Sequence, residues 1–180
     1  MEGYSLKKVF KSLIPVKYLP YILILLSLIG FFDALYLTII HYKNLFPPCT
    51  IGGCEVVLSS KYAMVGPFPT SLYGVAFYLA VIILTAILLT FYSSSKHDPS
   101  GKVVRSRESE SRSQGNSQLA QALTLIIFLL CLAGLGVGLF LVYLQIFVLH
   151  SFCQYCLFSE LIDFLMFDTA WWLYQNTKSI

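Results

Sequence analysis

The chain has 180 residues and a net charge of +3; 57% of its residues are hydrophobic and 12% are charged. An ordinary soluble domain has about 25% charged residues, and disordered chains contain few aromatic residues, whereas 16% of this chain is aromatic. The composition therefore argues against a soluble enzyme, a nucleic-acid-binding protein and a disordered chain.

Four apolar stretches, in chain order, are long enough to cross a bilayer, which takes roughly 20 residues. They cover residues 19–40, 71–92, 119–149 and 154–174. Because lipid offers no hydrogen bonds to an open backbone, each stretch must be a helix. The sequence therefore predicts an all-α membrane protein with one domain, a four-transmembrane-helix bundle.

The basic residues predict the orientation of this bundle, because Lys and Arg collect on the cytoplasmic side. Of the 12 Lys and Arg residues, all but Lys43 and Lys61 lie in the N-terminal tail, in residues 93–118 or at the C-terminus. Both termini and the linker 93–118 are therefore expected in the cytoplasm, and the loop 41–70 outside. The linker is rich in Ser and in charges of both signs, so we expect a flexible, solvated connection.

Four of the five cysteines fall on the predicted outer side of the membrane. Cys49 and Cys54 occur as C-T-I-G-G-C in the loop, and Cys153 and Cys156 as C-Q-Y-C where the last helix begins. Disulfides form and persist outside the cytoplasm, so the two pairs suggest two disulfides that can exchange. Cys131, in the middle of the third helix, is expected to be a small buried hydrophobic residue.

The position of each pair indicates a different role. At a helix N-terminus the backbone N–H groups stabilise a thiolate, the form of cysteine that attacks disulfides. The glycines at 52 and 53 give the loop pair conformational freedom, so that it could move between an outside partner and C-Q-Y-C. Two alternatives stay open: the four cysteines could form inert structural disulfides, or they could bind zinc, since their spacing suits zinc ligands.

Acidic residues also lie within or near the predicted spans. Charged groups are costly in lipid and usually face the bundle interior or water. They could relay protons, face a polar cavity, pair structurally or sit near helix ends. They are Asp33, Glu160, Asp163 and Asp168.

Several motifs together resemble the vitamin K epoxide reductase family. The loop with two cysteines is followed by V-V-L-S-S-K-Y-A and G-P-F-P-T-S-L-Y-G, the first helix contains D-A-L-Y-L-T, and C-x-x-C opens the last helix. The resemblance covers most of residues 19–170. In the related DsbB proteins the C-x-x-C lies in the first external loop, whereas here it comes last. The resemblance implies a four-helix bundle around a quinone, which would be ubiquinone, menaquinone or a vitamin K-type naphthoquinone.

The resemblance also implies roles for the cysteines at the matching positions. Cys153 and Cys156 would be the active-site pair, with Cys156 nearest the quinone. Cys49 and Cys54 would be the shuttle pair. Cys49 would meet the external partner, and Cys54 would attack Cys153.

Further positions match the family's quinone site. Ser60 corresponds to a serine or threonine that is important for activity. Thr70 and Ser71 lie where the loop enters the second helix, near the expected quinone pocket. Tyr155 flanks the active pair and could line this pocket, with simple aromatic packing as the alternative. No metal is expected at these positions.

The expected function is that of a quinone-dependent thiol–disulfide oxidoreductase, which reoxidises a separate thioredoxin-fold partner of the DsbA type. The partner is expected to be separate because the chain ends at Ile180 with no fused thioredoxin-like domain. The residues L-F-S-E after C-Q-Y-C, in place of T-T-Y, favour a microbial disulfide-forming role. The expected location is the plasma membrane, or the ER membrane in a eukaryote. Alternatives are a vitamin K epoxide or quinone reductase, and a non-catalytic membrane protein with structural disulfides.

Overall fold

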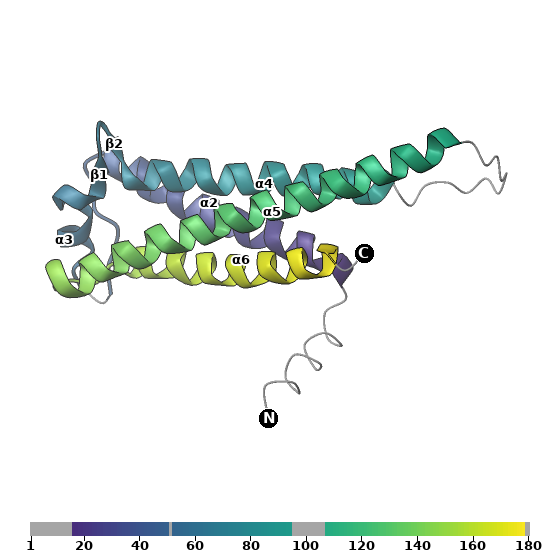
Figure 1. Ribbon diagram of the computed structural model, residues 1–180. Helices are drawn as coiled ribbons and strands as arrows, with labels where there is room; N and C mark the ends of the chain where they lie inside the picture. The colour runs from purple at the N-terminus through teal and green to yellow at the C-terminus, as the bar shows by residue number, and fades with distance from the viewer. Residues whose placement is uncertain (1–15, 51, 95–106, 179–180) are drawn as a thin grey trace, which may run out of the picture.

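The structure is a computed structural model that describes residues 16–50, 52–94 and 107–178. Four long helices lie side by side, and each runs antiparallel to the next along the chain (Figure 1). They are α2 (Leu19–Tyr42), α4 (Thr70–Ser94), α5 (Arg107–Tyr143) and α6 (Gln154–Lys178). A 3₁₀ turn, η1 (Val16–Tyr18), precedes α2, and a π-helical turn, η3 (Leu144–Val148), continues α5. The predicted helical fold is confirmed.

Three of these helices are long and apolar enough to cross a membrane, among the residues that the structure describes. The candidate spans are Leu19–Tyr42, Thr70–Phe91 and Gln118–Val148. The fourth helix, α6, has 25 residues but carries three carboxylates, which lower its hydropathy. The chain is therefore an all-α membrane protein with three candidate spans and a further long helix packed against them.

The predicted flexible linker 93–118 is wrong in its second half. Helix α4 continues to Ser94, and α5 begins at Arg107, well before the expected start at residue 119. Residues 107–118 contain Arg, Glu and Gln, which favour helix in spite of the polar composition. Composition alone marks a polar segment as solvated but does not distinguish a solvated helix from a coil.

Short elements between α2 and α4 cover one end of the bundle (Figure 1). They are α3 (Cys54–Leu58), the 3₁₀ turn η2 (Lys61–Ala63) and an antiparallel hairpin of β1 (Met64–Val65) and β2 (Phe68–Pro69). The sequence predicted only a loop at 41–70, because elements of two to five residues are too short to show a hydrophobic period. This end of the bundle carries both cysteine pairs.

The core lies between the four helices, and the outer faces remain apolar. Leu23, Ile127 and Met166 are fully buried, and Cys131 is 1% exposed, as predicted for a small buried hydrophobic residue. Large apolar side chains are instead exposed on the outside, such as Phe32, Ile83, Leu129 and Phe164. Soluble proteins rarely expose so much apolar surface, so these faces suit contact with lipid.

Two glycines let α5 approach its neighbours closely. A Cβ at Gly134 would meet the ring of Phe77 on α4, and one at Gly138 would meet the carboxylate of Glu160 on α6. The G-x-x-x-G spacing therefore serves helix packing. It brings the residues of α5 and α6 together around a cavity.

Candidate active site

The first cysteine pair forms a disulfide at the end of the bundle that carries α3 and the hairpin. Cys49 and Cys54 are joined by an S–S bond, and Cys54 is the first residue of α3. Gly52 and Gly53, which precede Cys54, have φ angles of 69° and 96°, a left-handed region that glycine adopts without strain. These turns carry the chain from the partly exposed Cys49 to the fully buried Cys54.

The second pair lies at the start of α6 as two free thiols. Cys153 directly precedes the helix and is fully buried, whereas Cys156 is half-buried in its first turn. The two sulfur atoms are 2.8 Å apart, and the backbone N–H of Cys156 points at the Cys153 sulfur at 3.4 Å. The predicted placement of C-Q-Y-C at a helix N-terminus therefore agrees with the structure.

Hydrogen bonds at this helix start favour a thiolate at Cys153. The thiol of Cys156 donates to its sulfur, and this bond, together with the backbone N–H groups of Cys156 and Tyr155, lowers the pKa of Cys153. Burial and the carboxylate of Asp33 oppose the effect but do not cancel it. Cys153 is thus the more nucleophilic of the pair.

The side chain of Gln145 fixes the position of Cys153. Its Oε1 accepts a hydrogen bond of 2.8 Å from the Cys153 backbone N–H, and Gln145 is 2% exposed. The π-helical turn η3 and a bond from Ser151 N–H to the Gln145 carbonyl shape the link to α6. The sequence carries a signal for this role that was not recognised above: an amide side chain near the end of an otherwise apolar helix.

The loop of the first pair lies against the start of α6. We call residues 48–50 and 52–53 the cysteine loop. Gln154 and Tyr155, which stand between the two cysteines of C-Q-Y-C, both hydrogen-bond to this loop. The two cysteine pairs are therefore neighbours, as an exchange of disulfides requires.

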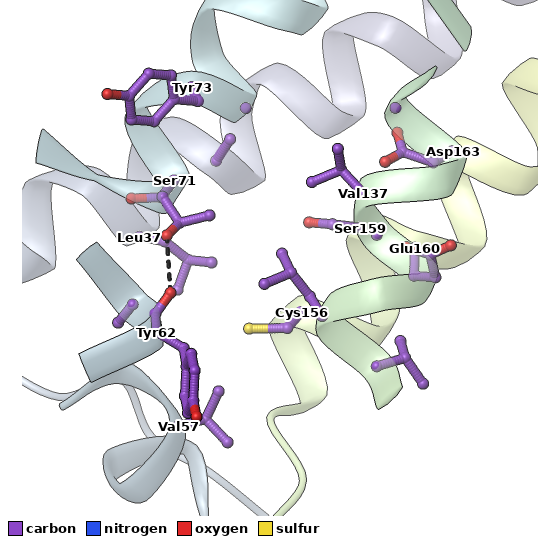
Figure 2. A pocket seen from close by; sticks show the side chains of 18 of the residues that line it. Leu37, Val57, Tyr62, Ser71, Tyr73, Val137, Cys156, Ser159, Glu160 and Asp163 are labelled. Carbon is purple, nitrogen blue, oxygen red and sulfur yellow. Dashed lines mark hydrogen bonds between the residues drawn. The ribbon is translucent and has the colours of Figure 1, made fainter. Parts of the chain in front are cut away.

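A cavity of about 380 Å³ lies beside Cys156, lined by residues of the four long helices and of the α3–η2 segment. In Figure 2 the thiol of Cys156 points into this space. The wall is largely apolar, with side chains such as Leu37, Phe77 and Val137. This size and lining are typical of sites for small organic ligands.

Three of the residues expected at a quinone site line this cavity: Ser60, Thr70 and Ser71. Each of their hydroxyls has a hydrogen bond within the protein. Ser60 donates to the Val57 carbonyl at 2.8 Å, Thr70 donates to the Tyr62 carbonyl at 3.1 Å, and the hydroxyl of Thr38 donates to that of Ser71 at 2.9 Å.

Tyr155, which the sequence placed either at a quinone pocket or in aromatic packing, does not line this cavity. Its hydroxyl donates to the Pro48 carbonyl at 3.1 Å, and its ring lies 5.7 Å from that of Tyr36. Residues 156, 159, 160 and 163 share the face of α6 that lines the cavity, as their helical spacing requires. Position 155 is rotated away from that face toward the cysteine loop.

The acidic residues divide into two groups. Asp33 accepts a hydrogen bond from Ser159, which ties α2 to α6 beside the cavity. Glu160 and Asp163 line the cavity, and one buried oxygen of each has no hydrogen-bond partner among the described residues. Asp168 is exposed and does not line it. Two of the four acids therefore face a cavity, one of the roles that the sequence left open.

The arrangement weighs against two alternatives. Zinc binding by four cysteines needs four thiolates at one site, but two of the sulfurs are joined in a disulfide. Structural disulfides would join Cys153 and Cys156, yet these are free thiols. One pair oxidised and the other reduced, at neighbouring positions, is the state expected during disulfide exchange.

Comparison with known protein families identifies the chain's relatives. The sequence model of the vitamin K epoxide reductase family matches residues 21–171. This range contains both cysteine pairs, the cysteine loop and all of the residues that line the cavity. No curated protein sequence matches the chain.

Proposed function

Because the chain belongs to the vitamin K epoxide reductase family, we propose that it is a quinone-dependent thiol–disulfide oxidoreductase that reoxidises a separate thioredoxin-fold partner of the DsbA type. Family membership and the apolar helices make the chain a membrane oxidoreductase. The partner, the acceptor and the order of electron transfer are what we propose in addition.

One observation carries this proposal: the C-x-x-C pair joins two different environments. Cys153 is buried beneath the cysteine loop, whereas the thiol of Cys156 points into the cavity (Figure 2). A dithiol in this position can receive electrons from one side and pass them to a ligand on the other. A structural disulfide would need neither the cavity nor the second pair.

The residues around the cavity fit a quinone ring. Its apolar wall suits the ring and an isoprenoid tail, and hydroxyl and carboxyl groups are available for polar contacts with the ring oxygens. When bound, a quinone supplies a two-electron acceptor that takes up two protons. On this proposal Ser71, Glu160 and Asp163 provide the polar contacts, since the Ser60 hydroxyl already donates to the Val57 carbonyl, and Cys156 is the nearest thiol.

The first step is exchange with the partner. A thiolate of the reduced partner attacks Cys49, the more exposed sulfur, and Cys54 leaves as a thiolate. The partner's second thiolate then displaces Cys49, so the partner leaves with a disulfide. The Cys49–Cys54 pair is now a dithiol.

The second step moves the electrons inward. The thiolate of Cys54 attacks Cys153 in the Cys153–Cys156 disulfide, and Cys156 leaves as a thiolate. Cys49 then attacks Cys54, which restores the loop disulfide and releases Cys153. The described state, with the loop pair oxidised and Cys153 and Cys156 reduced, follows this step.

The third step closes the cycle. Cys153 and Cys156 form their disulfide and give up two electrons and two protons, which balances the conversion of a quinone to a quinol. The carboxyl groups of Glu160 and Asp163, each with one buried oxygen that lacks a partner among the described residues, are placed to hold a proton on the same side of the cavity.

We further propose that α6 is a fourth span and that both termini are cytoplasmic. Then the cysteines lie on the extracytoplasmic side of the plasma membrane, or in the ER lumen in a eukaryote. The distribution of Lys and Arg supports this orientation. The carboxylates of α6 at positions 160 and 163 face the cavity rather than lipid, which lowers the cost of placing this helix in a bilayer.

Quinone reduction by the purified full chain tests this function. The protein in detergent receives a reduced DsbA-type partner and a series of water-soluble quinones, beside Cys156→Ala and a control, Cys131→Ala. We expect partner-dependent quinol formation that falls by about a thousandfold or more in Cys156→Ala and persists in Cys131→Ala, whose side chain does not line the cavity. A wild type that reduces none of the quinones would overturn the proposal. Reduction of vitamin K epoxide alone would favour the epoxide reductase alternative.

A further inference from the structure

We infer that Gln154 is a positioning residue that holds the cysteine loop on the start of α6, so that Cys54 and Cys153 can exchange. The inference rests on the proposed function only for the identity of the two reacting pairs. It assigns a role to a residue that stands between the active-site cysteines in sequence but does not touch the cavity.

The side chain of Gln154 binds the loop on both sides of Cys49. Its Oε1 accepts hydrogen bonds from the Thr50 backbone N–H at 3.1 Å and from the Thr50 hydroxyl at 2.7 Å. Its Nε2 donates to the Pro48 carbonyl at 3.2 Å. An amide side chain has separate donor and acceptor atoms. It can therefore bond to all three loop atoms at once, which a single hydroxyl, amine or carboxylate group cannot do.

A backbone contact continues the attachment of the loop beyond Thr50. Gly53 packs so closely on the segment before Cys153 that an added Cβ would lie 3.1 Å from the backbone N and O of Phe152 and 3.1 Å from the Ser151 Cβ. Cys54 follows at once in the chain. The loop is thus held at Pro48, Thr50 and Gly53, with Cys49 between the first two of these points and Cys54 directly after the third.

Burial makes this attachment important for the reaction. Cys54 and Cys153 are both 0% exposed, so neither thiol can meet its partner by diffusing through water. Exchange requires that the attacking sulfur approaches the disulfide in a fixed direction, and holding two groups in that geometry is worth several orders of magnitude in rate. Gln154 belongs to the rigid start of α6, and therefore ties the loop to the same element that positions Cys153.

The exchange that Gln154 promotes can be observed without a quinone or a partner. In a Cys156→Ser background the thiolate of Cys153 attacks Cys54: the Cys54–Cys153 bond forms, the Cys49–Cys54 bond breaks, and Cys49 leaves as a thiolate. Cys156 is absent and cannot resolve the new bond by attacking Cys153, and N-ethylmaleimide alkylates the free Cys49 and so prevents its reverse attack on Cys54. Mass analysis of peptides then gives the rate at which the Cys54–Cys153 disulfide accumulates.

We expect Gln154→Ala in this background to slow accumulation by about tenfold, because three hydrogen bonds to the loop are lost. Thr50→Val, which removes only the hydroxyl bond, should slow it by about threefold. The matched control is Thr169→Ala, whose hydroxyl bonds only to the Leu165 carbonyl of its own helix, and we expect the parent rate.

A double variant separates positioning from a general loss of structure. If Gln154 acts through the loop, Thr50→Val adds nothing once Gln154→Ala is present, whereas independent structural defects would multiply. An unchanged rate in Gln154→Ala, or multiplied effects in the double variant, would overturn the inference. Where Gln154→Ala fails to fold, an unchanged rate in Thr50→Val does the same. If the variants behave as expected but the protein reduces no quinone, the proposed function is contradicted and the role of Gln154 still stands.

Discussion

The cysteine loop and the cavity both contact α6, but they differ in whether their polar side chains are hydrogen-bonded within the protein. Around the start of α6 the amides of Gln145 and Gln154 are hydrogen-bonded to the backbone around the cysteines. One to two turns further along α6, Glu160 and Asp163 each keep a buried oxygen without a partner, among the described residues.

The difference reflects what each region must do. Exchange between two disulfides depends on the approach of one sulfur to another. Hydrogen bonds that fix the backbone at the contact between the cysteine loop and α6 therefore favour it. A ligand-binding site needs polar groups that are free to bond to the ligand, although each unsatisfied buried group costs about 1–3 kcal/mol of stability. The start of α6 thus holds the cysteine loop in place, and the next turns of the same helix offer polar groups to a ligand.

The largest effect should come from the tight contact of the loop. Gly53→Ala introduces the strain of a left-handed residue, about 1–2 kcal/mol, and adds a Cβ at 3.1 Å from the Phe152 backbone. The loop should detach, and maleimide should label Cys153 about tenfold faster than in the wild type, given a further cost of about 1–3 kcal/mol for overpacking. Peptide mass analysis measures the labelling.

Gly52→Ala is the matched control for this contact. Its φ is also positive, at 69°, but an added Cβ meets nothing within 4 Å. It should share the conformational strain without the collision, so Cys153 should be labelled more slowly than in Gly53→Ala. Equal labelling in both variants would mean that the contact between Gly53 and Phe152 contributes nothing to docking.

A second effect should appear at the wall of the cavity. The Cβ of Gly138→Ala overlaps the carboxylate of Glu160, and the helices can separate only at a cost of about 1–3 kcal/mol in the free energy of unfolding. Gly136→Ala, whose Cβ meets nothing within 4 Å, should instead gain up to about 1 kcal/mol from helix propensity. Denaturant unfolding in detergent measures both, and a Gly138→Ala protein as stable as Gly136→Ala would refute the close packing.

The carboxyl groups of Glu160 and Asp163, each with one buried oxygen that lacks a partner among the described residues, should show opposite effects on stability and activity. Glu160→Gln and Asp163→Asn remove a costly ionisable group from the interior, so each should raise the free energy of unfolding by about 1 kcal/mol. Each should also slow quinol formation, by about tenfold, through the loss of a proton-holding group. The control is Asp168→Asn, which lies outside the cavity; a similar slowing in that variant would point to charge rather than position.

The smallest effect concerns the acidity of Cys153. Since hydrogen bonds lower the pKa of Cys153, its alkylation by iodoacetamide should persist at a pH where an ordinary cysteine is protonated and unreactive. Cys156→Ala removes the largest of these bonds, so the midpoint of the rate against pH should move upward. A midpoint that stays in place in the variant would show that the thiol of Cys156 does not stabilise the thiolate.

Much of the bundle could be predicted because lipid imposes simple rules on sequence. The apolar run that begins at Leu19 ends in the structure at Tyr42, close to the expected residue 40, and α4 begins at Thr70 rather than 71. The cysteine pairs were visible from spacing alone. The early start of α5 at Arg107 was missed, because helix in a polar segment leaves no hydrophobic signal.

The details of the candidate site could not be predicted, because they are contacts between distant residues. Thr50 and Gln154 are separated by 104 positions, and no local pattern pairs them. Tyr155 was expected at the cavity on account of its neighbours in sequence, but a step of one residue on a helix rotates the side chain by about 100°. Glu160 and Asp163 fell on the cavity face by the same periodicity.

The π-helical turn η3 has a consequence for how the chain tolerates changes in length. Its bond from Leu149 N–H to the Leu144 carbonyl encloses one residue more than a regular α-helical turn. Deleting one residue there would restore regular winding, and four α-helical residues turn the chain about as far as the five π-helical ones, so Ser151 and Phe152 would keep their direction toward Gly53. A single-residue deletion in the regular part of α5, which contains no such additional residue, would instead turn everything beyond it by about 100° and move the two redox centres out of register.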